Sequence, residues 1–84
     1  MVMEDTTPRK QKLLKIGELA HLTGETIHTL RYWTKEGLLR VQDHTPGGYQ
    51  LYHPSMIEIA AEIRRLQAEK RLTIAEIRAA LRGE

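Results

Sequence analysis

The sequence predicts a mainly α-helical domain with a small β-hairpin, arranged as a winged helix-turn-helix. Two short amphipathic segments are separated by a few residues that contain Gly24. A Pro-Gly-Gly turn follows them, and two further amphipathic segments complete the chain. The predicted order is therefore helix, tight turn, helix, wing hairpin and two further helices. A length of 84 residues fits one domain.

The first two helices are expected to be joined by a tight turn. Apolar residues recur at helical spacing over residues 16–22, which predicts the first helix. Gly24 suits a left-handed turn position, and Thr26 suits the N-cap of the next helix. The second helix is expected over residues 27–36, with Gly37 as its stop signal.

The apolar face of the second helix should pack against the rest of the domain. Ile27, Leu30 and Trp33 share this face at helical spacing. A single large ring on an inward face usually contributes packing, so Trp33 is assigned to the core.

The wing is predicted from two short apolar segments around a turn. Residues 38–41 and 49–52 have the composition of strands, and Pro46-Gly47-Gly48 lies between them. We therefore expect a β-hairpin directly after the second helix.

Two further helices are expected after the hairpin. Pro54 suits the first turn of a third helix, with His53 beside it as a candidate N-cap. This helix should end around Lys70-Arg71. Thr73 and Glu76 have the spacing of a capping box, which predicts the start of the fourth helix.

Composition argues against several classes of function. The chain has no Cys, and its four His residues share no coordinating spacing, so we expect no metal or cofactor site. No nucleophile–base set and no phosphate-cradling glycine loop is recognisable, so catalysis is not expected. The apolar runs are too short to span a membrane, and the N-terminus lacks the pattern of a signal peptide. We therefore expect a cytoplasmic protein without a membrane partner.

The positive charges are unevenly distributed. The net charge is only +2, yet Arg9, Lys10, Lys12 and Lys15 follow one another without an intervening acid. We divide the chain into a flexible basic arm, residues 1–12, and a folded domain, residues 13–84. The arm could be a solvated tail or a segment that contacts phosphates, and the sequence favours neither.

The polar face of the second helix is the main candidate for function. Arg31 could bond to a phosphate or to guanine, and Tyr32 offers a hydroxyl to phosphate and a flat face to sugar. The alternative is structural: Arg31 would pair with Glu25 or Glu36, and Tyr32 would fill a gap.

Three segments carry a resemblance to a known family. They are KIGELAHLTGETIHTLRYWTKEGLL, GGYQLY and RRLQAEKRLTIAEIRAAL. Together they resemble the DNA-binding domain of the MerR family of bacterial regulators, from about Lys15 to Leu81. The resemblance implies that the second helix enters the major groove and that the wing contacts the flanking backbone. The expected DNA-binding residues are Lys15, Thr26, His28, Thr29, Arg31, Tyr32, Lys35, Arg40, Tyr49 and Gln50.

Three positions depart from the family pattern. Trp33 replaces the usual second Tyr, and Thr34 replaces an apolar or acidic residue. Gln50 stands where the wing normally has Arg, so a phosphate contact there would be weaker.

Double-stranded DNA is the expected partner, in sequence-specific regulation of bacterial transcription. The alternatives are an architectural DNA-binding role (excisionase, partition or recombinase-targeting module) and a protein-interaction module such as a co-chaperone modulator. The retained Arg31, Tyr32, Lys35 and Arg40 favour DNA over a protein partner. Family members dimerise through a long helix, so a homodimer would form through a region absent from these residues; a short relative could dimerise otherwise or not at all.

Overall fold

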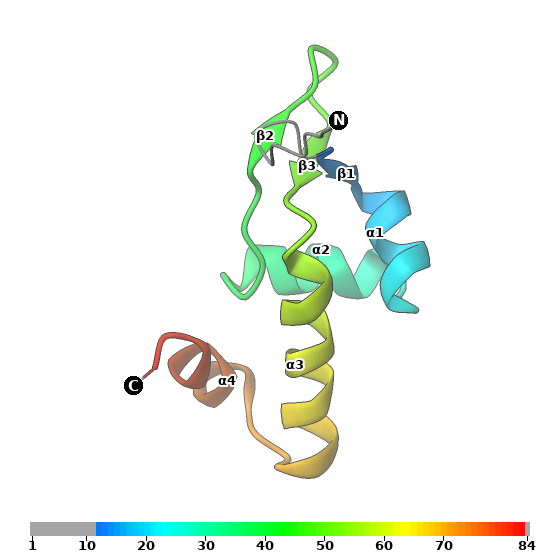
Figure 1. Cartoon of the computed structure of the whole chain (residues 1–84). Helices are drawn as coiled ribbons and strands as arrows, with labels where there is room; N and C mark the ends of the chain where they lie inside the picture. Colours follow the sequence, from blue (N-terminus) through cyan, green and yellow to red (C-terminus); the bar gives the residue numbers. More distant parts are fainter. Residues whose placement is uncertain (1–11, 84) are drawn as a thin grey trace, which may run out of the picture.

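The computed structural model describes residues 12–83, which form four helices and a small sheet (Figure 1). The elements are β1 (Leu14–Lys15), α1 (Ile16–Thr23), α2 (Ile27–Lys35), β2 (Asp43–His44), β3 (Gln50–Tyr52), α3 (Met56–Glu69) and α4 (Ile74–Leu81). The predicted order of helix, turn, helix, hairpin, helix and helix is confirmed. The predicted arm, residues 1–12, lies outside the described residues except for Lys12.

The sheet has three antiparallel strands in the order β1-β3-β2. Leu14 pairs with Tyr52, and His44 pairs with Gln50 at the outer end of the wing ladder. The sequence had not indicated β1, because a strand of two residues is too short to show an alternating pattern.

The first strand of the wing lies later in the chain than predicted. Residues 38–41 were expected to form it, but the structure places the strand at Asp43–His44. Leu38 and Leu39 are buried, and the N–H groups of both donate to the carbonyl oxygen of Trp33. These two residues therefore complete the end of α2 and the core, and are not available to the sheet.

A single core joins all four described helices to β3. Its fully buried large side chains are Trp33, Tyr52, Leu19, Leu30, Ile63 and Ile77. The assignment of Trp33 to the core is confirmed, since its side chain is only 2% exposed. The prediction for Ile27 is wrong, because it is 39% exposed. Ile27 is the first residue of α2, and it lies outside the buried part of the helix, which contains Leu30 and Trp33.

The predicted helix ends are largely confirmed. Gly24 follows α1 with a left-handed backbone (φ 78°). The Thr26 hydroxyl accepts from the N–H of Thr29 at 3.0 Å and caps α2. Thr73 and Glu76 form the expected reciprocal capping box of α4.

The third helix begins slightly later than expected. Its first helical residue is Met56, after a turn at Pro54-Ser55. The ring nitrogen Nδ1 of His53 accepts from the N–H of Ser55 at 3.0 Å. The prediction that His53 is the N-cap of this helix is therefore wrong, because Ser55 occupies that position and the His53 ring bonds within the turn that precedes the helix.

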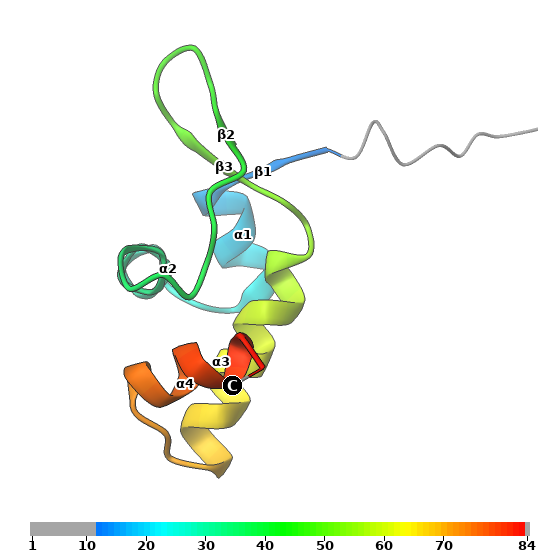
Figure 2. The same ribbon diagram turned by 90° about the vertical axis from the view of Figure 1, so that its left-hand side faces the viewer.

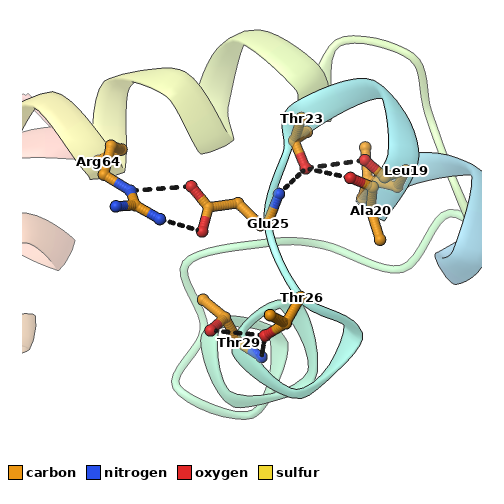
Figure 3. Close-up of polar contacts among 7 residues, drawn as sticks. All are labelled: Leu19, Ala20, Thr23, Glu25, Thr26, Thr29 and Arg64. Carbon is orange, nitrogen blue, oxygen red and sulfur yellow. Dashed lines mark hydrogen bonds and ion pairs between the residues drawn. The ribbon is translucent and has the colours of Figure 1, made fainter.

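An ion pair connects α3 to the turn between α1 and α2 (Figure 3). Arg64 donates from both Nε and a terminal nitrogen to the carboxylate of Glu25, with the Nε bond at 2.9 Å. The Glu25 side chain is only 7% exposed, and its own N–H donates to the hydroxyl of Thr23. The turn before the Thr26 cap is therefore fixed both locally and by α3.

Candidate nucleic-acid interface

The core contacts of α2 determine which of its side chains face outward. Leu30 and Trp33 bury one side of the helix. The side chains exposed on the remaining surface are His28, Arg31, Tyr32 and Lys35, with Thr29 partly buried. Tyr32 is 46% exposed, which excludes the alternative that it fills a gap in the core.

The structure excludes the ion pairs proposed as the structural alternative for Arg31, while a DNA contact by Arg31 stays a prediction. Glu25 and Glu36 were its candidate partners, but Glu25 pairs with Arg64 and Glu36 pairs with Arg78. Within residues 12–83, Arg31 has no ion pair. Its guanidinium therefore retains its donors for an external acceptor.

Thr26 and Thr29, at the start of α2, are hydrogen-bonded to each other. The Thr26 hydroxyl accepts from the Thr29 N–H and donates to the Thr29 hydroxyl at 3.0 Å (Figure 3). Their hydroxyls hold the helix N-terminus in shape, which places His28 and the first free amides of α2 at the surface. A DNA contact by Thr26 or Thr29 stays a prediction.

The wing presents an exposed tyrosine close to its tip. Gly48 donates its N–H to the carbonyl of Thr45 at 2.8 Å and has a left-handed backbone (φ 90°). Tyr49 follows this turn, is 69% exposed, and places its ring beside Gly47. In Figure 2, α2 is seen end-on and the wing rises above it on the same side of the molecule. A partner that touches α2 can therefore also reach the wing.

One groove gathers predicted residues from three elements. It has a volume of about 690 Å³ and is lined by Lys15 of β1, Arg31 of α2, and Tyr49 and Gln50 of the wing. A duplex phosphate could meet two cations, a phenol and an amide in this groove.

Sequence reasoning had missed two parts of this groove. His44 of β2 and the first turn of α1, with Gly17 and Glu18, also line it. The pairing of His44 with Gln50 across the wing brings His44 there. Because that pairing depends on the position of β2, no local sequence signal indicates His44.

The single acid that lines the groove, Glu18, is already hydrogen-bonded at the start of α1. The Glu18 carboxylate accepts from the Lys15 N–H at 2.9 Å. This bond, together with the charges of Lys12 and Lys15, lowers the pKa of Glu18. Glu18 therefore stays ionised and supports the start of α1.

The remaining predicted residues lie outside this groove. His28, Tyr32 and Lys35 lie on the exposed surface of α2. Arg40 is exposed on the segment after α2 and lines two other hollows, one of them beside His53 and Ser55. The structure thus places Arg40 apart from the Arg31 groove.

Residues 12–83 contain no group of three His, Cys, Asp or Glu side chains that could hold a metal ion. Over the same range, no helix is long and apolar enough to cross a membrane.

Comparison with known proteins finds relatives among the nodulation proteins of Bradyrhizobium. Nodulation protein NolA of Bradyrhizobium elkanii is 37% identical over 81 residues, which are 96% of this chain and 36% of that protein. NolA of Bradyrhizobium sp. strain NC92 is 38% identical over 96% of this chain and 33% of its own length. The chain thus spans about a third of the length of these curated relatives.

Solved structures share the fold. A MerR family transcriptional regulator from Bacillus cereus superposes with a TM-score of 0.66 at 28% identity, covering 83% of this chain and 52% of that one. HiNmlR, a MerR family regulator that lacks the sensor domain and was solved bound to promoter DNA, gives a TM-score of 0.68 at 19% identity. That alignment covers 80% of this chain and 52% of the HiNmlR chain, and it shows the winged helix-turn-helix fold alone.

The model of the MerR HTH family of regulatory proteins matches residues 14–84. Since this match covers most of the sequence, the chain belongs to the MerR family of helix-turn-helix regulatory proteins.

Proposed function

We propose that this chain binds double-stranded DNA in a sequence-specific manner and acts in bacterial transcriptional regulation. In this proposal α2 enters the major groove, which is wide enough to admit a helix, and the wing contacts the phosphate backbone beside it. Arg31 and Tyr32 are the principal contacts from α2, and Tyr49 is the principal contact from the wing.

The groove that joins α2, β1 and the wing is the observation that carries this proposal. Lys15, Arg31 and Tyr49 line it together although they come from three separate elements. Within residues 12–83 both acids near Arg31 in sequence are paired with other arginines, so Arg31 is not neutralised internally. An exposed cation and a phenol at one concave surface suit the phosphates of a duplex better than an apolar partner.

The relatives support the same function. HiNmlR, which shares the fold, was solved with promoter DNA. The Bacillus cereus neighbour is a transcriptional regulator of the MerR family.

The direct test is selection of duplexes from a random pool, followed by titration of the selected duplex. Arg31→Ala should weaken binding by about 1–3 kcal/mol and leave the melting temperature nearly unchanged. Its removal should also reduce the slope of log K against log salt by about 0.9, if the contact is to phosphate. The matched control is Arg65→Ala, because Arg65 is exposed on α3 and engaged with Glu62 and Glu69.

Two results would count against the proposal. Failure of the wild-type chain to bind any duplex at low salt would remove DNA as the partner. Equal losses of affinity in Arg31→Ala and Arg65→Ala would show a general effect of charge. The interface would then not be centred on Arg31.

The proposal also covers assembly and location. The homodimer implied by the family resemblance would form through residues outside these 84. The protein would act in the cytoplasm, and it would not catalyse a reaction. Sedimentation of this chain with the selected duplex measures how many copies bind one site. Cooperative binding of two copies through contacts within the 84 residues would contradict this view of the dimer.

A further inference from the structure

A hydrogen-bond network connects the wing to α2 inside the domain. Tyr52 of β3 is fully buried, and its phenol oxygen lies 2.9 Å from the hydroxyl oxygen of Thr34 on α2. The same phenol donates to the side-chain oxygen of Gln50 at 3.2 Å. The Thr34 hydroxyl also lies 2.8 Å from the carbonyl oxygen of Leu30.

The buried phenol makes this network necessary. A hydroxyl that loses water on folding must find partners in the protein, or it destabilises the native state. Thr34 and Gln50 are those partners. Each hydroxyl has a single proton, so two arrangements are possible. In one, Thr34 donates to the Tyr52 phenol and the phenol donates to Gln50. In the other, with the Gln50 amide turned, Gln50 donates to the phenol, the phenol donates to Thr34, and Thr34 donates to the Leu30 carbonyl. In both arrangements all three side chains stay connected.

The position of Gln50 gives the network a role in the wing. Gln50 pairs with His44 in the outermost pair of the wing ladder. Beyond this pair lies the turn, and the next residue, Tyr49, is the exposed tyrosine. The hydrogen bond from Tyr52 to Gln50 therefore restrains the residue that directly follows the exposed Tyr49.

The network also joins two of the departures from the family pattern. Thr34 and Gln50 are far apart in sequence, yet both contact the hydroxyl of Tyr52.

We propose that Gln50 is a positioning residue of the DNA interface, and that it acts through Tyr52 and Thr34. It fixes the wing relative to α2, so that Tyr49 and Arg31 meet one duplex together. This role rests on the proposed DNA binding, and it differs from the direct phosphate contact that the sequence suggested for Gln50.

The first test uses the free protein without DNA. Tyr52→Phe removes the hydroxyl and keeps the ring, and the Thr34 hydroxyl keeps Leu30 as its acceptor. The fold should therefore stay intact. In the variant, amide exchange at Thr45 and Gly48, whose N–H groups bond within the wing, should accelerate, while exchange in α3 stays unchanged. Wild-type exchange rates in the Tyr52→Phe wing would overturn the proposal.

The second test compares affinities for a selected duplex. Tyr52→Phe and Gln50→Ala should each weaken binding, roughly three- to tenfold as for one neutral hydrogen bond, and the double variant should bind no worse than the weaker single variant. Gln67→Ala, which removes an exposed amide from α3, is the control and should bind as wild type.

The outcomes separate the two roles of Gln50. If Gln50→Ala weakens binding and Tyr52→Phe does not, Gln50 contacts DNA directly and the positioning role is wrong. Additive losses in the double variant would also overturn it. If the wild type binds no duplex, the proposed function fails, whereas the exchange measurement still tests whether the network holds the wing.

Discussion

The guanidinium of Arg78 on α4 closes the C-terminal end of α2 at Glu36. Its Nε donates to the Glu36 carbonyl oxygen at 2.8 Å, and a terminal nitrogen lies 3.2 Å from the Glu36 carboxylate. Figure 1 shows α4 below this end of α2. The last carbonyls of a helix have no partner within the helix, so an arginine from another element satisfies a group that would otherwise need water.

Arg78→Met should lower the free energy of unfolding by about 1–2 kcal/mol, because charge-assisted hydrogen bonds are lost while the aliphatic stem remains. Urea denaturation measures the change. Arg82→Met is the control, since Arg82 lies one turn later, is exposed and has no ion pair within residues 12–83. Equal stability of the Arg78 variant and wild type would mean that solvent replaces this cap without cost.

Trp33→Ala should lower the free energy of unfolding by roughly 3–5 kcal/mol, because it removes the largest buried side chain and leaves a cavity. The neighbouring Tyr32→Ala serves as control and should cost much less, since Tyr32 is about half exposed. Chemical denaturation of both variants gives the comparison. A stable Trp33→Ala protein would be incompatible with the core described above.

Tyr49→Ala should weaken DNA binding without changing the preferred sequence, because the wing is assigned to the phosphate backbone. Repeating the duplex selection with the variant shows whether the preference changes. Tyr49→Phe separates the hydroxyl from the ring and should retain more affinity if the ring packs against sugar. A new preferred sequence in Tyr49→Ala would reveal base recognition by the wing.

The Glu18 carboxyl should titrate below its ordinary pKa, because it accepts the Lys15 N–H and lies near the charges of Lys12 and Lys15. A pKa that is lower in the folded than in the unfolded state means that ionised Glu18 adds stability above the unfolded pKa. That contribution is lost as the pH falls through the folded pKa. The melting temperatures of wild type and Glu18→Gln should therefore converge in acid, and NMR titration of the carboxyl checks the direction of the shift. An ordinary or raised pKa would contradict this role.

Local sequence signals were sufficient for the N-caps of α2 and α4. Thr26 and Thr73 act on backbone groups only three residues away, so the residues involved can be read together in the sequence. Element order followed from the same local patterns. The exposed set on α2 followed from the spacing of Leu30 and Trp33, although the spacing alone did not show that Ile27 lies beyond the buried part.

Features that depend on distant parts of the chain could not be predicted. The position of β2 depends on Leu38 and Leu39 packing into a core built partly by later helices. Arg64 contacts Glu25 across 39 positions and Arg78 contacts Glu36 across 42 positions, and no periodic pattern marks either pair. These two contacts occupy Glu25 and Glu36, and they therefore determine that Arg31 is not paired with either acid.

Both ends of α2 are thus attached to residues that come later in the chain. Glu25, just before the helix, is held by Arg64, and Glu36, just after it, is held by Arg78. Neither contact can form until its later residue has been synthesised, and the contact at Glu36 requires the chain as far as Arg78. A fragment that ends before α4 would therefore contain all of α2 but lack the contact at its C-terminal end.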